Sequence, residues 1–242
     1  MRRTQFRTAG MLGFVFMAIL FSGCSHPLTI KNLKDYYNPG MTSLEKKLAI
    51  GIVSSTGDIH CDNLVKGVGE ALARSSADVL LPYNTSSSRK VDVIANITVQ
   101  PEYEGSAWNF LVNFPGFLVF APAWNGYVYS VNYNVAVQMK TYEGEELGGF
   151  NLPINLNVRH AAMNRTWTEI SWFEVGAIAL VGGIIFTQYD DNVSPLVAEK
   201  VRGPIGDYIA QEMVNRINNS GKFVNAPMKT DGEEQQLFSL RK

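Results

Sequence analysis

YVYSVNYNVAVQM, residues 127–139, alternates between two kinds of side chain. Its odd positions carry Tyr127, Tyr129, Val131, Tyr133, Val135, Val137 and Met139. Successive side chains of a β-strand point to opposite faces, so this period of two predicts a strand with one buried face. The turn YEGEELGG then leads to a second alternating stretch at 152–158, which predicts an antiparallel hairpin.

A strand–helix–strand pattern precedes this hairpin. Short apolar runs predict three further strands, at 48–53, 79–83 and 91–99. Apolar residues at helical spacing predict a helix at 62–75 and another at 195–218. A strand, a helix and a strand in this order favour a parallel pair with a crossover helix. We therefore expect an α/β (or α+β) domain over 46–222, with a mixed sheet of about five strands and helices packed on it.

A long stretch without formal charge, Gly105 to Met139, separates the two patterns. Its first part, an apolar insertion at 105–126, is rich in aromatic residues. We predict a contact surface for membrane or partner subunits; the alternative is a connection folded over the domain's own core. A second apolar segment at 175–186 is too short for a typical spanning helix. The candidate interface residues are Trp108, Phe110, Phe114, Phe117, Phe120 and Trp124.

The amino-terminal residues predict how the protein is targeted in the cell. Three arginines precede the apolar run MLGFVFMAILF, which has the length of a signal-peptide core. The run closes on Ser22-Gly23-Cys24, which resembles the lipobox of bacterial lipoproteins. The resemblance implies a signal peptide at 1–23 and lipidation of Cys24; an uncleaved anchor or an ordinary signal peptide is the alternative. We expect residues 24–45 to form a lipidated tether and 223–242 a polar tail.

The same resemblance implies a location. Residue 25 is Ser rather than Asp, which by similarity to enterobacterial sorting rules favours the outer membrane, with the domain facing the periplasm. Three acyl chains anchor such a protein stably. Cleavage before Cys24 would remove three of the 21 basic residues and leave 18 against 22 acidic ones. This composition offers no basic excess for nucleic acid, so the expected partners are the membrane, through the lipid, and other proteins or further copies of the chain.

The sequence offers few catalytic candidates. His60-Cys61-Asp62, with His160 as a distant base, contains the residue types of a thiol nucleophile. Neighbouring residues rarely aim at one another, so we interpret Cys61 as a structural thiol. Scattered carboxylates show no spacing typical of a hydrolase pair; they are Glu102, Glu104, Glu169, Glu174, Asp190 and Asp191. We therefore expect no catalytic residue, no metal site and no cofactor.

The combined pattern is similar to a class of envelope proteins. A lipobox, a tether and a domain opening strand–helix–strand–strand resemble periplasmic modules of CsgG-type curli-secretion lipoproteins and the amino-terminal domain of TolB, over roughly 46–100 and 195–218. In CsgG-type proteins a central insertion forms membrane hairpins of an oligomeric pore, and the strands at 127–139 and 152–158 stand in a comparable place. Three functions stay open: a non-enzymatic assembly, interaction or export-accessory lipoprotein, a subunit of an oligomeric export channel, and an envelope hydrolase.

Overall fold

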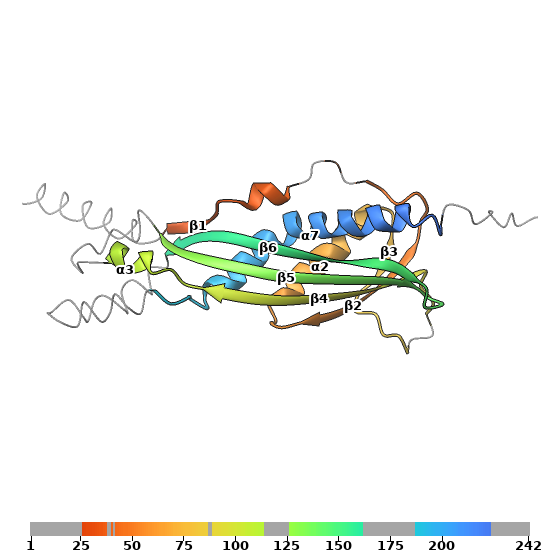
Figure 1. Ribbon diagram of the computed structural model, residues 1–242, viewed down its shortest axis with the longest axis horizontal. Coiled ribbons are helices and arrows are strands. Elements are labelled where there is room, and N and C mark those ends of the chain that lie inside the picture. Colours follow the sequence, from red (N-terminus) through yellow and green to blue (C-terminus); the bar gives the residue numbers. More distant parts are fainter. Residues whose placement is uncertain are drawn as a thin grey trace, which may run out of the picture.

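The computed structural model describes residues 26–37, 40, 42–86, 89–113, 126–161 and 187–223. These residues form one mixed six-stranded sheet with the strand order β1-β6-β5-β4-β2-β3 (Figure 1). The strands are β1 (His26–Ile30), β2 (Ala49–Thr56), β3 (Asp78–Leu80), β4 (Val93–Glu104), β5 (Tyr127–Thr141) and β6 (Glu146–Ala161). The helices are η1 (Leu33–Tyr36), α2 (Cys61–Arg74), α3 (Trp108–Asn113) and α7 (Val193–Asn219). The α/β prediction is confirmed.

The alternation at 127–139 is confirmed side chain by side chain. Every odd position from Tyr127 to Met139 is buried, and the even positions are half-buried or exposed. β5 lies between β4 and β6, and both pairings are antiparallel. β2 pairs in parallel with both β3 and β4, as the strand–helix–strand pattern predicts. The period-two pattern thus identifies the strand that lies at the centre of the sheet's antiparallel half.

Two prolines lie inside long strands, where a missing N–H would normally interrupt pairing. Pro101 of β4 is opposite Tyr133, beyond the last residue of β2 that pairs with β4, which is Thr56 at Val99. Pro153 of β6 is opposite Asn134, and β1 reaches β6 only at its far end. Each proline therefore lies where its strand has a neighbouring strand on one side only. For that reason both strands can extend beyond the residues that their apolar patterns predict.

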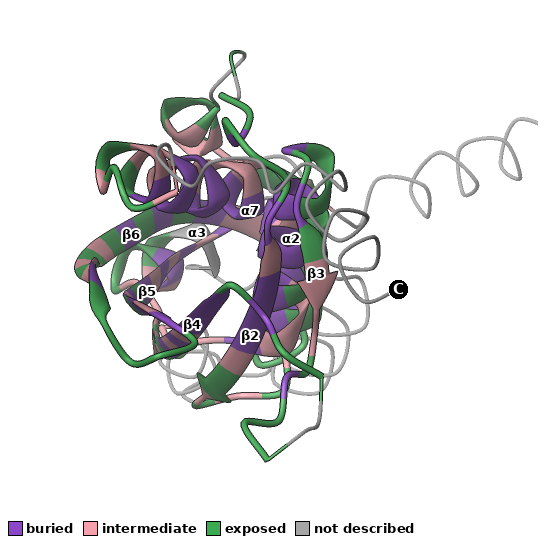
Figure 2. Cartoon of the chain, turned by 90° about the vertical axis from the view of Figure 1, so that its right-hand side faces the viewer, coloured by how far each residue is buried: buried purple, intermediate pink, exposed green. Residues whose placement is uncertain are grey.

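The two long helices fill the hollow of the curled sheet, as the view along the molecule shows (Figure 2). They cross closely because each presents a glycine: a Cβ at Gly67 would stand 2.2 Å from the Arg202 carbonyl oxygen, and one at Gly206 would stand 2.5 Å from the Gly67 carbonyl carbon. Exposed ion pairs join the helices at Arg74–Asp207 and Arg202–Glu70. The core consists of the inner sheet face and the facing sides of α2 and α7.

The expected tether at 24–45 is wrong for its central part. β1 pairs antiparallel with β6, and Lys200 Nζ donates to the Leu28 carbonyl oxygen at 2.7 Å. Asn32 then follows the edge of β6, where its Oδ1 accepts from Asn157 N–H at 3.0 Å. Edge strands pair on one side only, so His26–Ile30 alternates between half-buried and exposed residues and shows little apolar signal.

Candidate functional site

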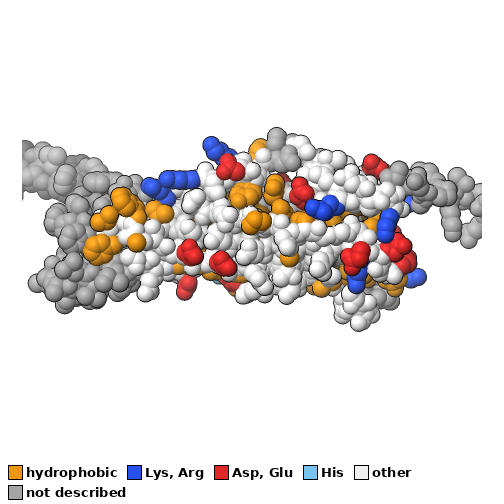
Figure 3. Space-filling model, in the orientation of Figure 1, with side chains coloured by type: hydrophobic (Ala, Val, Ile, Leu, Met, Phe, Trp, Pro, Cys, Tyr) orange, Lys and Arg blue, Asp and Glu red, His pale blue; other side chains and the backbone are white. Residues whose placement is uncertain are grey.

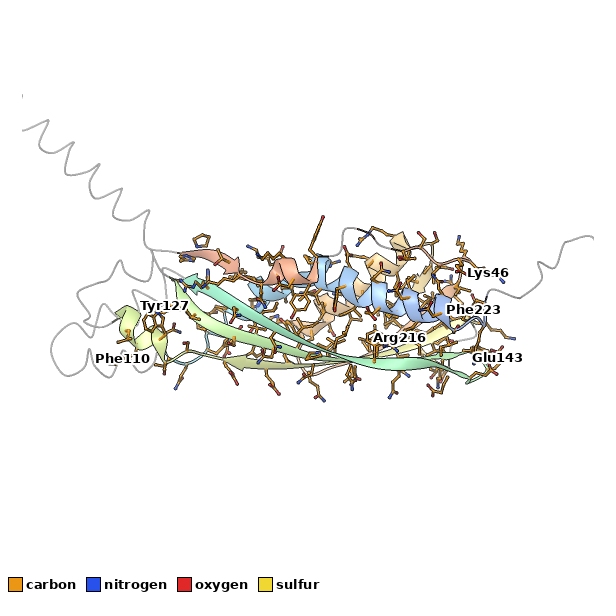
Figure 4. All side chains as sticks on the ribbon, turned by 45° about the horizontal axis from the view of Figure 1, so that its top comes forward. Lys46, Phe110, Tyr127, Glu143, Arg216 and Phe223 are labelled. Carbon is orange, nitrogen blue, oxygen red and sulfur yellow. The ribbon has the colours of Figure 1, made fainter. Side chains whose placement is uncertain are left out.

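One end of the sheet holds the two candidate interface residues that the structure describes, Trp108 and Phe110, and we call it the α3 end. It consists of His26, α3, Gly126–Tyr129, Ala161 and Thr187–Tyr189. Figure 4 places Phe110 and Tyr127 at this end and Lys46, Glu143, Arg216 and Phe223 at the other. The segments 114–125 and 162–186, and the residues before His26, all join the described chain here.

A side-chain clasp fixes α3 to the sheet. Asn109 is fully buried; its Oδ1 accepts from Val128 N–H at 2.7 Å and its Nδ2 donates to the Val128 carbonyl oxygen at 2.9 Å. The pairing of β4 with β5 ends at Glu104 and Ser130, so the carboxamide takes the place that a longer β4 would occupy beside Val128. Ser106 supports the helix start, because its Oγ accepts from Trp108 N–H at 3.2 Å. The short helix is thereby held in one position.

The clasped helix exposes large apolar side chains. Trp108 is 59% exposed and Leu111 is 54% exposed, whereas Phe110 is half-buried. Residues three apart lie on the same side of a helix, so Trp108 and Leu111 form one face. Figure 3 shows hydrophobic side chains gathered at this end beside the undescribed atoms, with Lys or Arg side chains above them, and side chains of both charges at the opposite end.

The chain that returns at Thr187 is also held tightly. A Cβ at Gly105 would stand 1.9 Å from the Thr187 carbonyl oxygen, so only glycine permits this approach. Tyr189 stacks on Tyr103 at a centroid distance of 4.8 Å and meets Tyr129 edge-on at 5.4 Å. Burial raises the pKa of Tyr189 to about 12, so its hydroxyl stays protonated and bonds to Ser194 Oγ at 3.1 Å.

The amino-terminal strand completes this end. His26 is opposite Ala161 in the sheet, and its ring lies over Gly126, where a Cβ would stand 2.9 Å from the imidazole Cγ. His160 is opposite Tyr127; its buried Nδ1 has no hydrogen-bond partner among the described residues. Burial lowers the pKa of His160 below its usual 6.5. The pairing with Ala161 and the close contact with Gly126 therefore fix the first described residue of the chain.

The thiol candidate does not form a catalytic pair. Cys61 is 1% exposed, and burial, followed by the charges of Asp58 and Asp62, raises its pKa to about 12. A thiol in this state is a poor nucleophile at neutral pH. Cys61 lies near Tyr133, whose pKa it helps to raise, whereas His160 is opposite Tyr127. These two tyrosines are six positions apart along β5, about 20 Å of strand.

Four of the carboxylate candidates lie in the described part of the chain. Glu102 and Glu104 are exposed on β4, and Asp191 is exposed before α7. Asp190 is buried, and its Oδ1 accepts from the backbone N–H and the side-chain Nδ2 of Asn192 at 3.1 and 3.0 Å. Within the described ranges, no group of three or more His, Cys, Asp or Glu side chains could hold a metal ion.

Several predicted residues lie outside the described part of the chain. They are the lipidation candidate Cys24, the interface residues Phe114, Phe117, Phe120 and Trp124, the carboxylates Glu169 and Glu174, the segment 175–186 and all of the polar tail except Phe223. Phe223 itself packs against the core. Among the described helices, none is long and apolar enough to cross a membrane.

Sequence reasoning missed the residues that position this end. Asn109 and Leu111 belong to a run interpreted only as apolar, and the clasp depends on a partner, Val128, 19 residues away. The Gly105–Thr187 approach joins positions further apart still. One signal was available: Asn109 is a polar residue inside a charge-free run, where a buried amide needs hydrogen-bond partners. No protein-family model and no curated protein matches this sequence.

Proposed function

We propose that the protein is an outer-membrane-anchored periplasmic lipoprotein with a non-enzymatic assembly, interaction or export-accessory role in the cell envelope. The observation that carries the proposal is the position of His26, which is paired with Ala161 in the sheet. Consecutive Cα atoms are about 3.8 Å apart, so Cys24 Cα lies within about 8 Å of His26 Cα. A lipid on Cys24 would therefore be attached directly at the α3 end of the domain, with no free tether between them.

This placement gives the domain an orientation. The undescribed apolar segments join the chain at the same end as the proposed lipid, so membrane contact at that end accommodates all three. β5 has 15 residues, which at strand spacing is about 50 Å. The end that carries the β5–β6 turn would then extend away from the bilayer, where partners in the periplasm reach it.

The described surface favours binding over chemistry. A shallow groove of about 450 Å³ runs along the outer face of β4, β5 and β6, and no titratable side chain belongs to its described lining. Amide and hydroxyl groups supply its polarity, among them Gln100, Asn134 and Asn151. Such a surface offers hydrogen bonds without an acid, a base or a nucleophile. These features support an interaction role.

A channel subunit is the second candidate. It is supported by the positions at which the segments 114–125 and 162–186 join the described chain, because both segments join it at the same end. Ring-shaped particles of uniform size in detergent would favour this candidate. Monomers or dimers that retain their membrane attachment would favour the interaction role.

Replacing the proposed lipidated cysteine tests the main proposal. In Cys24→Ala, we expect the precursor to remain unprocessed, as read by mass, and the acyl chains to be missing. Cys61→Ala is the matched control, because Cys61 is buried in α2 and should leave processing and acylation unchanged. An unchanged amino-terminal mass and unchanged membrane fractionation of Cys24→Ala would overturn the proposal.

A further inference from the structure

The α3 end carries a second feature besides the proposed lipid, namely the exposed face of α3. Trp108 and Leu111 are two of six large hydrophobic side chains that are exposed among the described residues. The Asn109 clasp holds them in place, so their exposure is built into the fold and is not the result of a loose loop. A fixed apolar face at this end of the sheet is a candidate contact surface.

The distribution of tryptophan points to the nature of that surface. The chain has four tryptophans: Trp108 lies on α3, and Trp124, Trp167 and Trp172 lie in the segments that leave the chain at the α3 end. Tryptophan has an apolar ring with one N–H donor, and it concentrates at the boundary between hydrocarbon and headgroups. The sheet and the two long helices contain none.

The charged residues of this end lie on β6 and before α7, where Arg159 is opposite Val128 and Asp190 is buried, rather than on α3 or β5. Neither Gly105–Asn113 nor Gly126–Met139 contains a formal charge. Insertion of α3 into the boundary therefore desolvates no ionised group of its own. Because α3 has no lysine or arginine, attraction to anionic headgroups contributes nothing through this helix, and contact must depend on burial of apolar area.

We propose that the face of α3 formed by Trp108 and Leu111 inserts into the hydrocarbon–headgroup boundary of the bilayer that holds the lipid of Cys24. The inference rests on the proposed lipid anchor and adds a second contact to it. A single anchor lets a domain pivot about its attachment. Two contacts at one end hold the long axis of the sheet away from the membrane plane and keep the opposite end in water.

Quenching of Trp108 by lipid tests this inference. The acylated full-length protein, with Trp124→Phe, Trp167→Phe and Trp172→Phe, is reconstituted into neutral phosphatidylcholine vesicles with brominated acyl chains. We expect blue-shifted Trp108 emission that the bromines quench, unchanged by high salt. Leu111→Asp should reduce the quenching. Tyr142→Asp, at a 42% exposed position in the β5–β6 turn, is the matched control and should leave it unchanged.

The outcomes separate this inference from the lipid anchor. Mass and flotation with vesicles report acylation, and quenching reports insertion of α3. Two results would overturn the insertion while supporting the lipid anchor, both for a protein that is acylated and floats with the vesicles. In the first, Trp108 emits as it does in water. In the second, Trp108 is shielded by a second copy or a partner protein that can be cross-linked to it. If the three replacements disturb folding, the difference in quenching between the parent and Trp108→Phe gives the same information, and no difference overturns the inference.

Discussion

The two ends of the sheet differ in the polarity of their surfaces. At the end that carries the β5–β6 turn, charges surround the apolar groups: Arg216 lies 4.9 Å from the ring centroid of Phe150, and Lys222 pairs with Glu145 at 2.9 Å. At the α3 end, Asn109 and the Tyr189 hydroxyl make their hydrogen bonds to uncharged groups, while Trp108 and Leu111 face outward. One end of the sheet thus carries ion pairs and the other an exposed apolar face, and the proposed membrane contact depends on this difference.

The largest effect should come from charging the core that joins the two ends. Val131→Asp places a carboxylate on the fully buried face of β5 without a partner. We expect a loss of roughly 4 kcal/mol or more in the free energy of unfolding, measured by urea denaturation. Asn134→Asp, on the exposed face three residues later, should change it by less than about 0.5 kcal/mol. Equal tolerance at the two positions would contradict the assigned faces.

A smaller effect should come from adding one methyl group at the α3 end. Gly105→Ala would bring its Cβ to 1.9 Å from the Thr187 carbonyl oxygen, so the backbone must shift. We expect a loss of about 1–3 kcal/mol in unfolding free energy. Gly40→Ala, where nothing lies within 4 Å of the added Cβ, should stay within about 0.5 kcal/mol of the parent. A Gly105→Ala variant as stable as Gly40→Ala would show that 187–189 does not pack on β4.

The α3 end should also respond to pH. Burial lowers the pKa of His160 below 6.5, against the opposing effects of the His26 backbone and Asp190. The unfolded chain therefore takes up this proton at a higher pH than the folded chain does. Its contribution to stability is complete above about pH 6.5 and is lost as the pH falls through the folded-state pKa.

Denaturation at a series of pH values measures this dependence. His160→Gln should flatten the decline in unfolding free energy just below pH 6.5, while His60→Gln, at the start of α2, should retain it. A decline that persists unchanged in His160→Gln would assign the titration to another group. Asp58 titrates in a lower window: burial acts to raise its pKa, but hydrogen bonds from His60 N–H and Tyr103 lower it below 3.8.

The smallest effect should come from the charged end. Glu145→Gln removes the partner of Lys222, but the two side chains are 64% and 36% exposed. Exposed ion pairs contribute little, so we expect a change below about 1 kcal/mol that vanishes at high salt. A loss as large as that of Gly105→Ala, persisting at high salt, would mean that the hydrated end is more tightly coupled to the core than its exposure indicates.

The two ends also differ in how much of them the sequence predicts. Strands and helices follow local periodicity, so the central strand at 127–139 and the helices at 62–75 and 195–218 could be located closely. β1 could not, because its five residues pair on one side only and include Pro27. The sequence predicts a contact surface that includes Trp108, with a connection folded over the core as the alternative. The Asn109 clasp on Val128, which holds Trp108 in place, joins residues across an interval that no local pattern reports.

The central claim is that the α3 end faces the bilayer and the opposite end faces water. Cys61 is buried with its pKa raised to about 12, so in the acylated protein a single introduced cysteine can be labelled alone. A polarity-sensitive fluorophore is attached in vesicles at Ala107→Cys, beside α3, or at Glu143→Cys, in the β5–β6 turn. We predict apolar emission at Ala107→Cys and aqueous emission at Glu143→Cys. Aqueous emission at both positions, or the reverse order, would contradict the claim.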